Sequence, residues 1–139
     1  PGLGGWRPTG AEGEYAARAG CPHAYCNRHG EPTTLDRVGW YAENAERELQ
    51  PVAQKEPNPW GLHDLYGNAW EWVADGYAPY SAEDQTDTWG PPYSVARVSR
   101  GGDFFDSAGV ARAAYRLGIH PDDGFWFHGF RVCLPVAPS

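Results

Sequence analysis

Apolar and polar residues alternate over short distances along this chain, and two segments carry a clear periodicity. Thr9 stands three residues before Glu12, which is the capping-box spacing of a helix start. We therefore predict a helix over residues 9–18, with Tyr15 facing a core. Residues 69–74 alternate large and small side chains, which predicts a strand with Trp70 and Trp72 on one face.

The remaining pattern predicts only short elements separated by turns. Prolines, glycines and asparagines break the chain at residues 21–32, 57–61 and 75–92, and we expect loops or turns there. The other predicted elements are a strand at 38–41, a helical turn or short helix at 42–49, a strand at 95–99, a strand or turn at 111–116 and a closing strand at 130–134. Such a mixture fits many short, irregular segments better than a helical bundle.

Length and composition indicate one domain with much irregular structure. The chain has 139 residues, enough for a single domain over 1–139. It contains 18 glycines, 13 prolines and 7 tryptophans. Glycine and proline serve turns, and tryptophan supplies large apolar faces. Many short segments around an aromatic core are therefore expected.

The net charge and the cysteine count indicate which kinds of partner and which cellular compartments are expected for this chain. The net charge is −7 and Lys55 is the single lysine, so we expect no nucleic-acid partner. No apolar run reaches the roughly 20 residues of a membrane span, and no signal peptide opens the chain. Three cysteines do not make a disulfide framework, although Cys21 and Cys26 are able to pair. The compartment stays open, with the cytoplasm favoured.

Four motifs together resemble one family. They are TGAEGEYAAR at 9–18, NPWGLHDLYGNAWEW at 58–72, RVSRGG at 97–102 and GFRV at 129–132. In this order they are similar to the motifs of formylglycine-generating-enzyme-type (sulfatase-modifying-factor) domains. The resemblance implies a C-type-lectin-like α+β fold with short strands and much irregular structure.

The chain departs from that family at its beginning. Family domains start well upstream of the helix motif, with strands that pair against the last strand, and that N-terminal part is absent here. The chain thus resembles the C-terminal portion of such a domain. The resemblance implies that its partner is the missing N-terminal portion of the same domain, either in cis or as a second chain. Within the helix motif, Gly13 stands where an aromatic residue is usual.

The resemblance also bears on copper. Oxidases of this family resemble copper proteins in which two cysteine thiolates hold Cu(I). The two cysteines lie shortly after the Gly-Gly motif, and thiolates are soft ligands that suit this ion. Here no cysteine follows Gly102 until Cys133. We therefore expect no copper and no formylglycine-generating chemistry, and the balance leans away from an enzyme.

Calcium is the cofactor that the resemblance implies. The family's structural calcium site surrounds the GNAWEW motif. Carried over, its ligands are the side chains of Asp64 and Glu71 and the carbonyl oxygens of Gly67 and Ala69. All-oxygen ligation suits this hard cation. In the alternative interpretation, Glu71 only satisfies backbone N–H groups of the turn.

Two other sets of side chains suggest chemistry without settling it. Cys21, His23, Cys26 and His29 are zinc-type ligands, but a small disulfide loop or unrelated surface residues explain them equally. Several carboxylates lie in turn-rich polar sequence, where solvated loop residues are the favoured interpretation over acid–base catalysis. They are Asp122, Asp123, Glu83, Asp84 and Asp87.

Residues 103–128, between the two closing motifs, are the candidate binding segment. Phe104 is expected in the core. Residues 125–128 are four consecutive large side chains, which in an extended chain must point both ways, so some are exposed. Rigid aromatics beside small polar residues are typical of binding loops.

The same segment resembles the ligand surface of variable proteins of diversity-generating retroelements. There, mutation at template adenines yields many residue types but not Lys, Glu, Gln or Met, and residues 103–128 contain none of these four. A protein or small-molecule ligand is the implied partner. The residues expected to face it are Phe105, Asp106, Ser107, Gly109, Val110, Tyr115, Leu117, Ile119, His120, Phe125, Phe127 and His128.

Three functions remain open from sequence alone. The favoured one is a non-catalytic binding module, with or without diversification of 103–128. The second is a domain of a related oxidoreductase, such as an ergothioneine-pathway iron-dependent sulfoxide synthase or a formylglycine-generating-like oxidase. The third is a structural or regulatory module attached to a kinase or protease.

Overall fold

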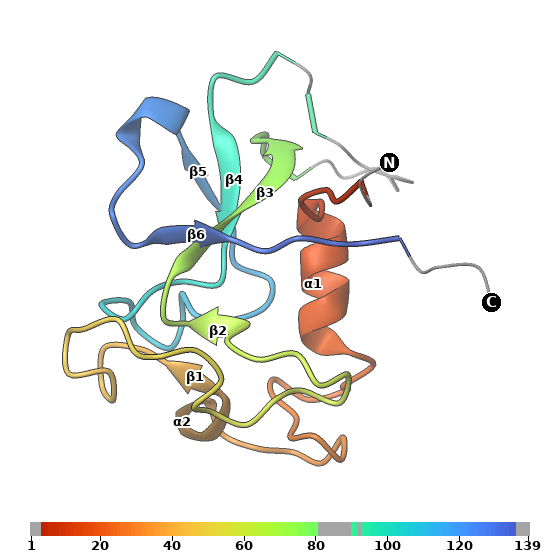
Figure 1. The fold of residues 1–139 in the computed structure, drawn as a ribbon, viewed down its shortest axis with the longest axis vertical. Helices are drawn as coiled ribbons and strands as arrows, with labels where there is room; N and C mark the ends of the chain where they lie inside the picture. The colour runs from red at the N-terminus through yellow and green to blue at the C-terminus, as the bar shows by residue number, and fades with distance from the viewer. Residues whose placement is uncertain (1–3, 81–89, 92, 136–139) are drawn as a thin grey trace.

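The computed structural model describes residues 4–80, 90–91 and 93–135 (Figure 1). Four of its strands form one sheet in the order β5-β4-β3-β6, and β1 and β2 form a small parallel pair. The elements are α1 (Gly10–Arg18), α2 (Leu35–Val38), β1 (Gly39–Trp40), β2 (Tyr66–Gly67), β3 (Trp70–Gly76), β4 (Arg97–Arg100), β5 (Leu117–Ile119), η1 (Pro121–Asp123) and β6 (His128–Phe130).

The main sheet mixes strand directions. β4 lies antiparallel to both β3 and β5, whereas β6 runs parallel to β3. Helix α1 packs against β3 and β4, as Figure 1 shows. After β4 the chain pairs beside it as β5, and it then crosses to the opposite edge of the sheet, where β6 lies beside β3.

Helix α1 begins where the capping box predicts. The Thr9 hydroxyl oxygen accepts from the Glu12 N–H at 3.2 Å, and the Thr9 N–H donates to Glu12 Oε2 at 2.7 Å. The helix ends at Ala19, which adopts a left-handed conformation. The expectation for Tyr15 is wrong: its side chain is 68% exposed and packs only on Trp60. The face of α1 that packs inward carries small residues instead.

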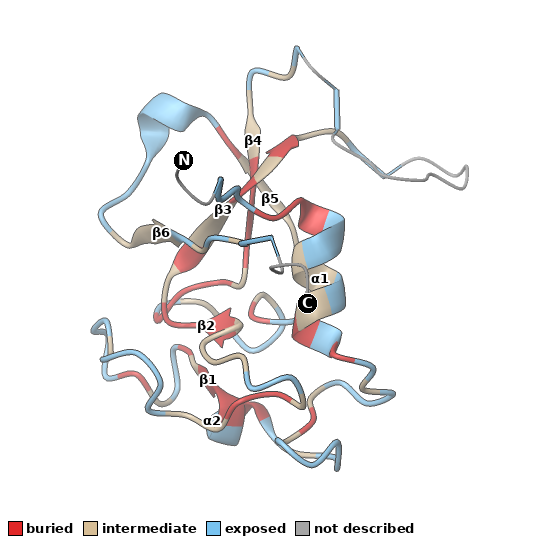
Figure 2. Cartoon of the chain, turned by 45° about the vertical axis from the view of Figure 1, so that its right-hand side comes forward, coloured by how far each residue is buried: buried red, intermediate tan, exposed pale blue. Residues whose placement is uncertain are grey.

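Two groups of buried residues form the core (Figure 2). The first lies around Tyr66, whose hydroxyl donates to the Ala17 carbonyl oxygen at 2.8 Å. The second lies under β4, where Val98 and Phe104 are fully buried. The first group consists of Ala17, Leu35, Val38, Tyr41, Tyr66 and Ala111. These contacts tie α1, α2 and the β4–β5 connection together.

Several predicted elements differ from the observed ones. Residues 42–49 form turns rather than a helix, because Glu46 and Arg47 take positive φ angles of 55° and 61°. Residues 111–114 form bends and turns, one of the two alternatives predicted for 111–116, and the strand follows at β5. The last strand begins and ends earlier than expected. Beyond it, Trp6 and Cys133 form an isolated antiparallel bridge.

The strands near the two central motifs are confirmed. β3 covers the predicted strand at 69–74 and extends to Gly76, and β4 overlaps the one predicted at 95–99. Much of the predicted loop at 75–92 lies outside the described residues, as do the candidate acids Glu83, Asp84 and Asp87. Within the described part of the chain, no helix has the length and apolar character needed to cross a membrane.

Candidate ligand-binding surface

The candidate segment leaves β4 through two glycines that the backbone requires. Gly101 and Gly102 have φ angles of 95° and 73°, a region that side chains disfavour. A Cβ on Gly102 would also lie 3.1 Å from the Ala111 backbone. Asp103 then caps the next turn, since its Oδ1 accepts from the Phe105 N–H at 2.7 Å. The segment therefore starts from a fixed position.

An array of aromatic rings forms where the segment returns to the sheet. His128 stacks on Trp72 with ring centroids 4.9 Å apart. Phe125 and Phe127 lie nearly parallel, 5.1 Å apart. Phe127 meets Phe104 edge-on at 5.9 Å, a favoured geometry for aromatic pairs. We call Trp72, Phe104, Phe105, Phe125, Trp126, Phe127 and His128 the ring cluster.

The ring cluster has a buried base and an exposed top. Phe104 is 0% exposed, whereas its neighbour Phe105 is 50% exposed. Phe125 is 54% and Trp126 is 74% exposed. Contiguous exposed apolar surface of this kind marks interaction sites in soluble proteins. The cluster can therefore bind an apolar or aromatic group by stacking and burial.

His128 gives the ring cluster a polar element. Neither of its ring nitrogens has a hydrogen-bond partner among the described residues. Burial is the main cause that lowers the pKa of His128. At neutral pH the imidazole is therefore uncharged, with one donor and one acceptor nitrogen, both of them buried.

The structure sorts the predicted ligand-facing residues into three groups. The exposed ones are Phe105, Ser107, Gly109, His120 and Phe125. The partly buried ones are Asp106, Val110, Tyr115, Leu117, Phe127 and His128. Ile119 is only 9% exposed, because it pairs with Arg97 within the sheet. The inclusion of Ile119 in the ligand-facing set is therefore corrected.

Sequence reasoning missed two members of the surface. Trp126, the most exposed ring of the cluster, is absent from the predicted ligand-facing set. Trp72 was assigned to the strand face alone, yet it stacks on His128. The run of consecutive rings at 125–128 was a sufficient signal for Trp126. Nothing local to residues 69–74 indicates the contact with His128.

The side chains expected to bind calcium have other partners here. Arg131 Nε and Nη2 donate to the two carboxylate oxygens of Glu71, each at 2.6 Å. Burial disfavours the charge of Arg131, but the bonds to Glu71 hold its pKa above the ordinary value. Asp64 Oδ2 accepts from the Ala53 N–H at 2.7 Å, and its Oδ1 is buried without a partner in the described residues. In this arrangement Arg131 is the partner of the Glu71 carboxylate, and calcium at Asp64, Gly67, Ala69 and Glu71 stays a prediction.

The zinc interpretation of the N-terminal loop is wrong. Cys21 and Cys26 form a disulfide with their Cα atoms 5.9 Å apart, so neither sulfur is a thiolate ligand. His23 and His29 are exposed. Among the described residues no three His, Cys, Asp or Glu side chains converge on a metal position.

The sequence and the fold of this chain are both similar to those of known proteins. The profile of the Sulfatase-modifying factor enzyme 1-like domain matches residues 3–135. The chain belongs to this family. The structure of Treponema denticola variable protein 1 superposes with a TM-score of 0.85 and 33% sequence identity, covering 96% of this chain and 49% of that one. The expected C-type-lectin-like α+β fold of the formylglycine-generating-enzyme type is thus confirmed.

Other relatives of this sulfatase-modifying-factor-like chain include an enzyme and an inactive protein. The formylglycine-generating enzyme of Streptomyces coelicolor is 37% identical over 140 residues, 89% of this chain and 45% of that protein. The inactive C-alpha-formylglycine-generating enzyme 2 of Mus musculus is 34% identical, covering 91% of this chain and 43% of that protein. The chain spans about half the length of these relatives.

Proposed function

We propose that this chain is a non-catalytic binding domain and that the ring cluster is the centre of its ligand surface. The observation that carries the proposal is the exposure of Phe105, Phe125 and Trp126 above the buried Phe104. Rigid aromatic side chains bind a partner at low cost in conformational entropy, and they dominate binding energies. A protein or an apolar small molecule is the ligand class that this surface favours.

We further propose that the exposed part of 103–128 is diversified by a retroelement. The similarity to a protein titled a variable protein supports this, as does the absence of Lys, Glu, Gln and Met from the segment. The arrangement also suits diversification. Phe104 and the pairing of β6 with β3 hold the segment, so exposed side chains can change without loss of the core.

A display library tests the binding proposal. One library varies five exposed positions of the surface, and a matched library varies five exposed positions elsewhere. We expect binders to a model protein such as lysozyme from the first library only, with cooperative unfolding retained. Equal enrichment from both libraries would contradict the proposal. The surface positions are Phe105, Ser107, Gly109, His120 and Phe125, and the control positions are Arg28, Glu31, Glu43, Glu46 and Glu48.

The non-catalytic part of the proposal rests on the cysteines. Cys133 is the one cysteine outside the disulfide, so no thiolate pair is available to hold Cu(I). Burial raises the pKa of Cys133, and the charge of Glu12 adds to this, so its thiol is protonated at neutral pH. We expect no aldehyde when the chain is incubated with Cu(I), oxygen and a cysteine-containing peptide. Aldehyde above the background of a heat-denatured sample would contradict the proposal.

We also propose a position for the N-terminal portion that family domains carry before the matched region. That portion packs against β6. β6 is one of the two edge strands of the described sheet, and exposed apolar side chains lie at its end, Phe130, and just beyond it, Val132 and Leu134. An unpaired edge with apolar side chains favours pairing with another strand. We expect the β6 amides that do not face β3 to exchange rapidly with solvent in this chain and to be protected when that portion is supplied. Unchanged exchange would argue against this partner.

Calcium at Asp64 and Glu71 is kept as a proposal with a direct test. Calcium that binds the folded chain must raise its thermal unfolding midpoint, by mass action. Unfolding is compared in excess EDTA and in excess calcium, with magnesium as the control cation. Identical midpoints in all three conditions would remove the site.

A further inference from the structure

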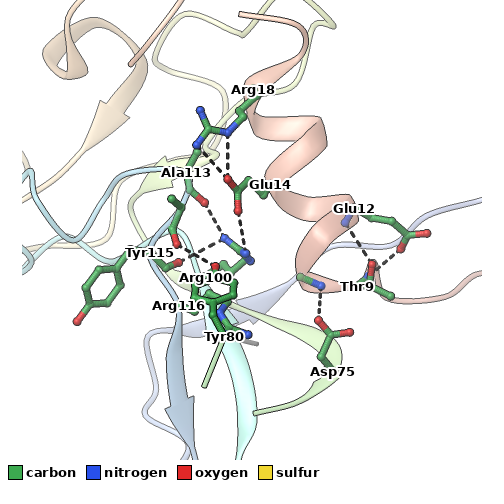
Figure 3. Close-up of polar contacts among 12 residues, drawn as sticks. Thr9, Glu12, Glu14, Arg18, Asp75, Tyr80, Arg100, Ala113, Tyr115 and Arg116 are labelled. Atoms are coloured by element: carbon green, nitrogen blue, oxygen red, sulfur yellow. Dashed lines mark hydrogen bonds and ion pairs between the residues drawn. The ribbon is translucent and has the colours of Figure 1, made fainter. Parts of the chain in front are cut away.

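A polar cavity lies between the N-terminal half of α1 and the main sheet, and none of its residues belongs to the ring cluster (Figure 3). Its volume is about 110 Å³. It is lined by Gly10, Ala11, Glu14, Asp75, Tyr80, Arg100 and Arg116. These residues come from α1, β3, the end of β4 and the segments next to β3 and β5, so the fold brings them together from distant parts of the chain.

Asp75 contributes a buried carboxylate that is only half satisfied. The residue is 7% exposed. Its Oδ2 accepts from the Gly10 N–H at 2.6 Å, as Figure 3 shows. Its Oδ1 is buried without a hydrogen-bond partner among the described residues. A buried acceptor without a donor is costly, so this oxygen favours a group that donates.

Arg100 and Arg116 each contribute a buried N–H donor that has no hydrogen-bond partner among the described residues. Arg100 is 8% exposed, and its terminal nitrogens donate to the Ala113 carbonyl oxygen at 2.6 Å and to Glu14 Oε2 at 3.2 Å. Arg116 Nη2 donates to the Ala78 carbonyl oxygen at 2.8 Å. The Nε of each arginine is buried with no acceptor in the described part of the chain. These contacts fix both guanidinium groups and leave one buried N–H of each without an acceptor among the described residues.

One class of small molecule matches this combination. A carboxylate suits guanidinium donors, and an ammonium group suits a buried carboxylate oxygen. A plain anion would leave Asp75 Oδ1 without a donor, and a plain cation would leave the two Nε donors without an acceptor. The cavity has room for about three or four waters at roughly 30 Å³ each, which is the size of a very small solute.

We propose that this cavity binds a small α-amino acid, of the size of glycine or alanine. Its carboxylate accepts from Arg100 and Arg116, and its ammonium group donates to Asp75. Tyr80 covers the cavity beside Arg116, whose guanidinium carbon lies 3.7 Å from the centre of the tyrosine ring. The site is independent of the ring cluster and does not rest on the proposed binding function.

Titration of the full 139-residue chain with glycine tests the proposal. The backbone amide resonances of Gly10 and Ala11 are followed, because the Gly10 N–H is held by Asp75. Acetate and methylammonium, each carrying one half of the ligand chemistry, serve as comparison probes. We expect saturable shifts with glycine and at least about tenfold weaker binding of either half-ligand, the effect of losing one charge-assisted hydrogen bond.

Three variants separate recognition from folding. Asp75→Asn keeps an oxygen for the Gly10 N–H but removes the charge that an ammonium group requires, and Arg116→Gln removes a donor at a less buried position. Each is expected to weaken glycine binding by about tenfold or more. Asp123→Asn changes an exposed carboxylate outside the cavity and should leave binding unchanged.

Two results of the titration would contradict the proposal. Absence of saturable shifts with glycine would mean that water alone fills the cavity. Equal binding of acetate and glycine would mean that the cavity is a simple anion site. Either result overturns the proposal.

Discussion

Residues 58–76 and residues 119–130 are both rich in aromatic side chains, but the fold buries Tyr66 and Trp70 of the first region, although Trp60 is 49% exposed, and exposes most rings of the second. In the first region Tyr66 and Trp70 are 3% and 4% exposed. In the second, Phe125, Trp126 and Phe130 are 54%, 74% and 67% exposed. Figure 2 shows the same contrast between the buried β2 and β3 and the exposed chain around η1.

The two regions also differ in how their polar groups are bonded. Asn58, 3% exposed, donates from Nδ2 to the Ala16 carbonyl oxygen at 2.7 Å and accepts from the N–H groups of Trp60 and Leu62 at 3.0 Å each. In residues 119–130 the bonds are mainly local backbone contacts and the pairing of β6 with β3. The first region therefore specifies the fold, and the second is free to present side chains to a ligand.

The largest expected difference lies between two adjacent phenylalanines. Phe104→Ala removes a fully buried ring that supports the ring cluster, and we expect a loss of about 3–5 kcal/mol in the free energy of unfolding. Phe105→Ala, at a half-exposed position, should cost less than about 1 kcal/mol. Urea unfolding of the two variants measures both values. Similar losses would show that the boundary between core and surface is misplaced.

The next effect concerns two asparagines that cap turns in the same manner. Asn58→Ala leaves buried backbone groups without partners, and we expect a loss of about 2–3 kcal/mol. Asn27 accepts from the N–H groups of His29 and Glu31 in an exposed loop. Asn27→Ala should cost no more than about 1 kcal/mol. Thermal unfolding distinguishes the two, and an equal loss would argue against burial as the cause.

A smaller, pH-dependent effect comes from His128. Burial lowers its pKa from 6.5, so between the folded and the ordinary value the unfolded chain binds more protons. Stability is therefore complete above about pH 6.5 and falls as the pH drops toward the lowered value. We expect His128→Phe to flatten this decline in urea midpoints between pH 7 and 5. A variant that keeps the whole slope would place its origin elsewhere. Burial raises the pKa of Asp75 above its ordinary value of 3.8, so this group makes the folded chain less stable as the pH rises from about 3.8 toward the raised value.

The smallest effect is expected at the most exposed ring. Trp126→Ser should change the free energy of unfolding by no more than about 0.5 kcal/mol, because the side chain is 74% exposed. Differential scanning calorimetry against the parent chain checks this. A loss above about 2 kcal/mol would show that Trp126 belongs to the core rather than to a binding surface.

Sequence reasoning succeeded where the signal is local. The capping box at Thr9 and Glu12 marks the start of α1, and the alternation at 69–74 marks β3. The ring surface followed from consecutive large side chains at 125–128, which cannot all face one side of an extended chain. The fold class followed from four motifs in the family's order.

Sequence reasoning failed where the outcome depends on distant contacts. Residues 42–49 have helix-forming composition, yet Gln50 pairs with Asn68 through two hydrogen bonds and the chain turns instead. Ile119 is buried because β5 adds to the edge of β4. Asp75, Arg100 and Arg116 share no motif, and only the packing of α1 on the sheet brings them around one cavity.

The central claim is that 103–128 presents a variable binding surface on a constant framework. The most direct test is deep sequencing of this gene across a population of its source cells. The account predicts substitutions concentrated at exposed positions such as Phe105, Ser107, His120 and Phe125, with Phe104 and the flanking residues 97–102 and 129–132 unchanged. A uniform segment across the population, or substitutions spread evenly over the framework, would contradict it.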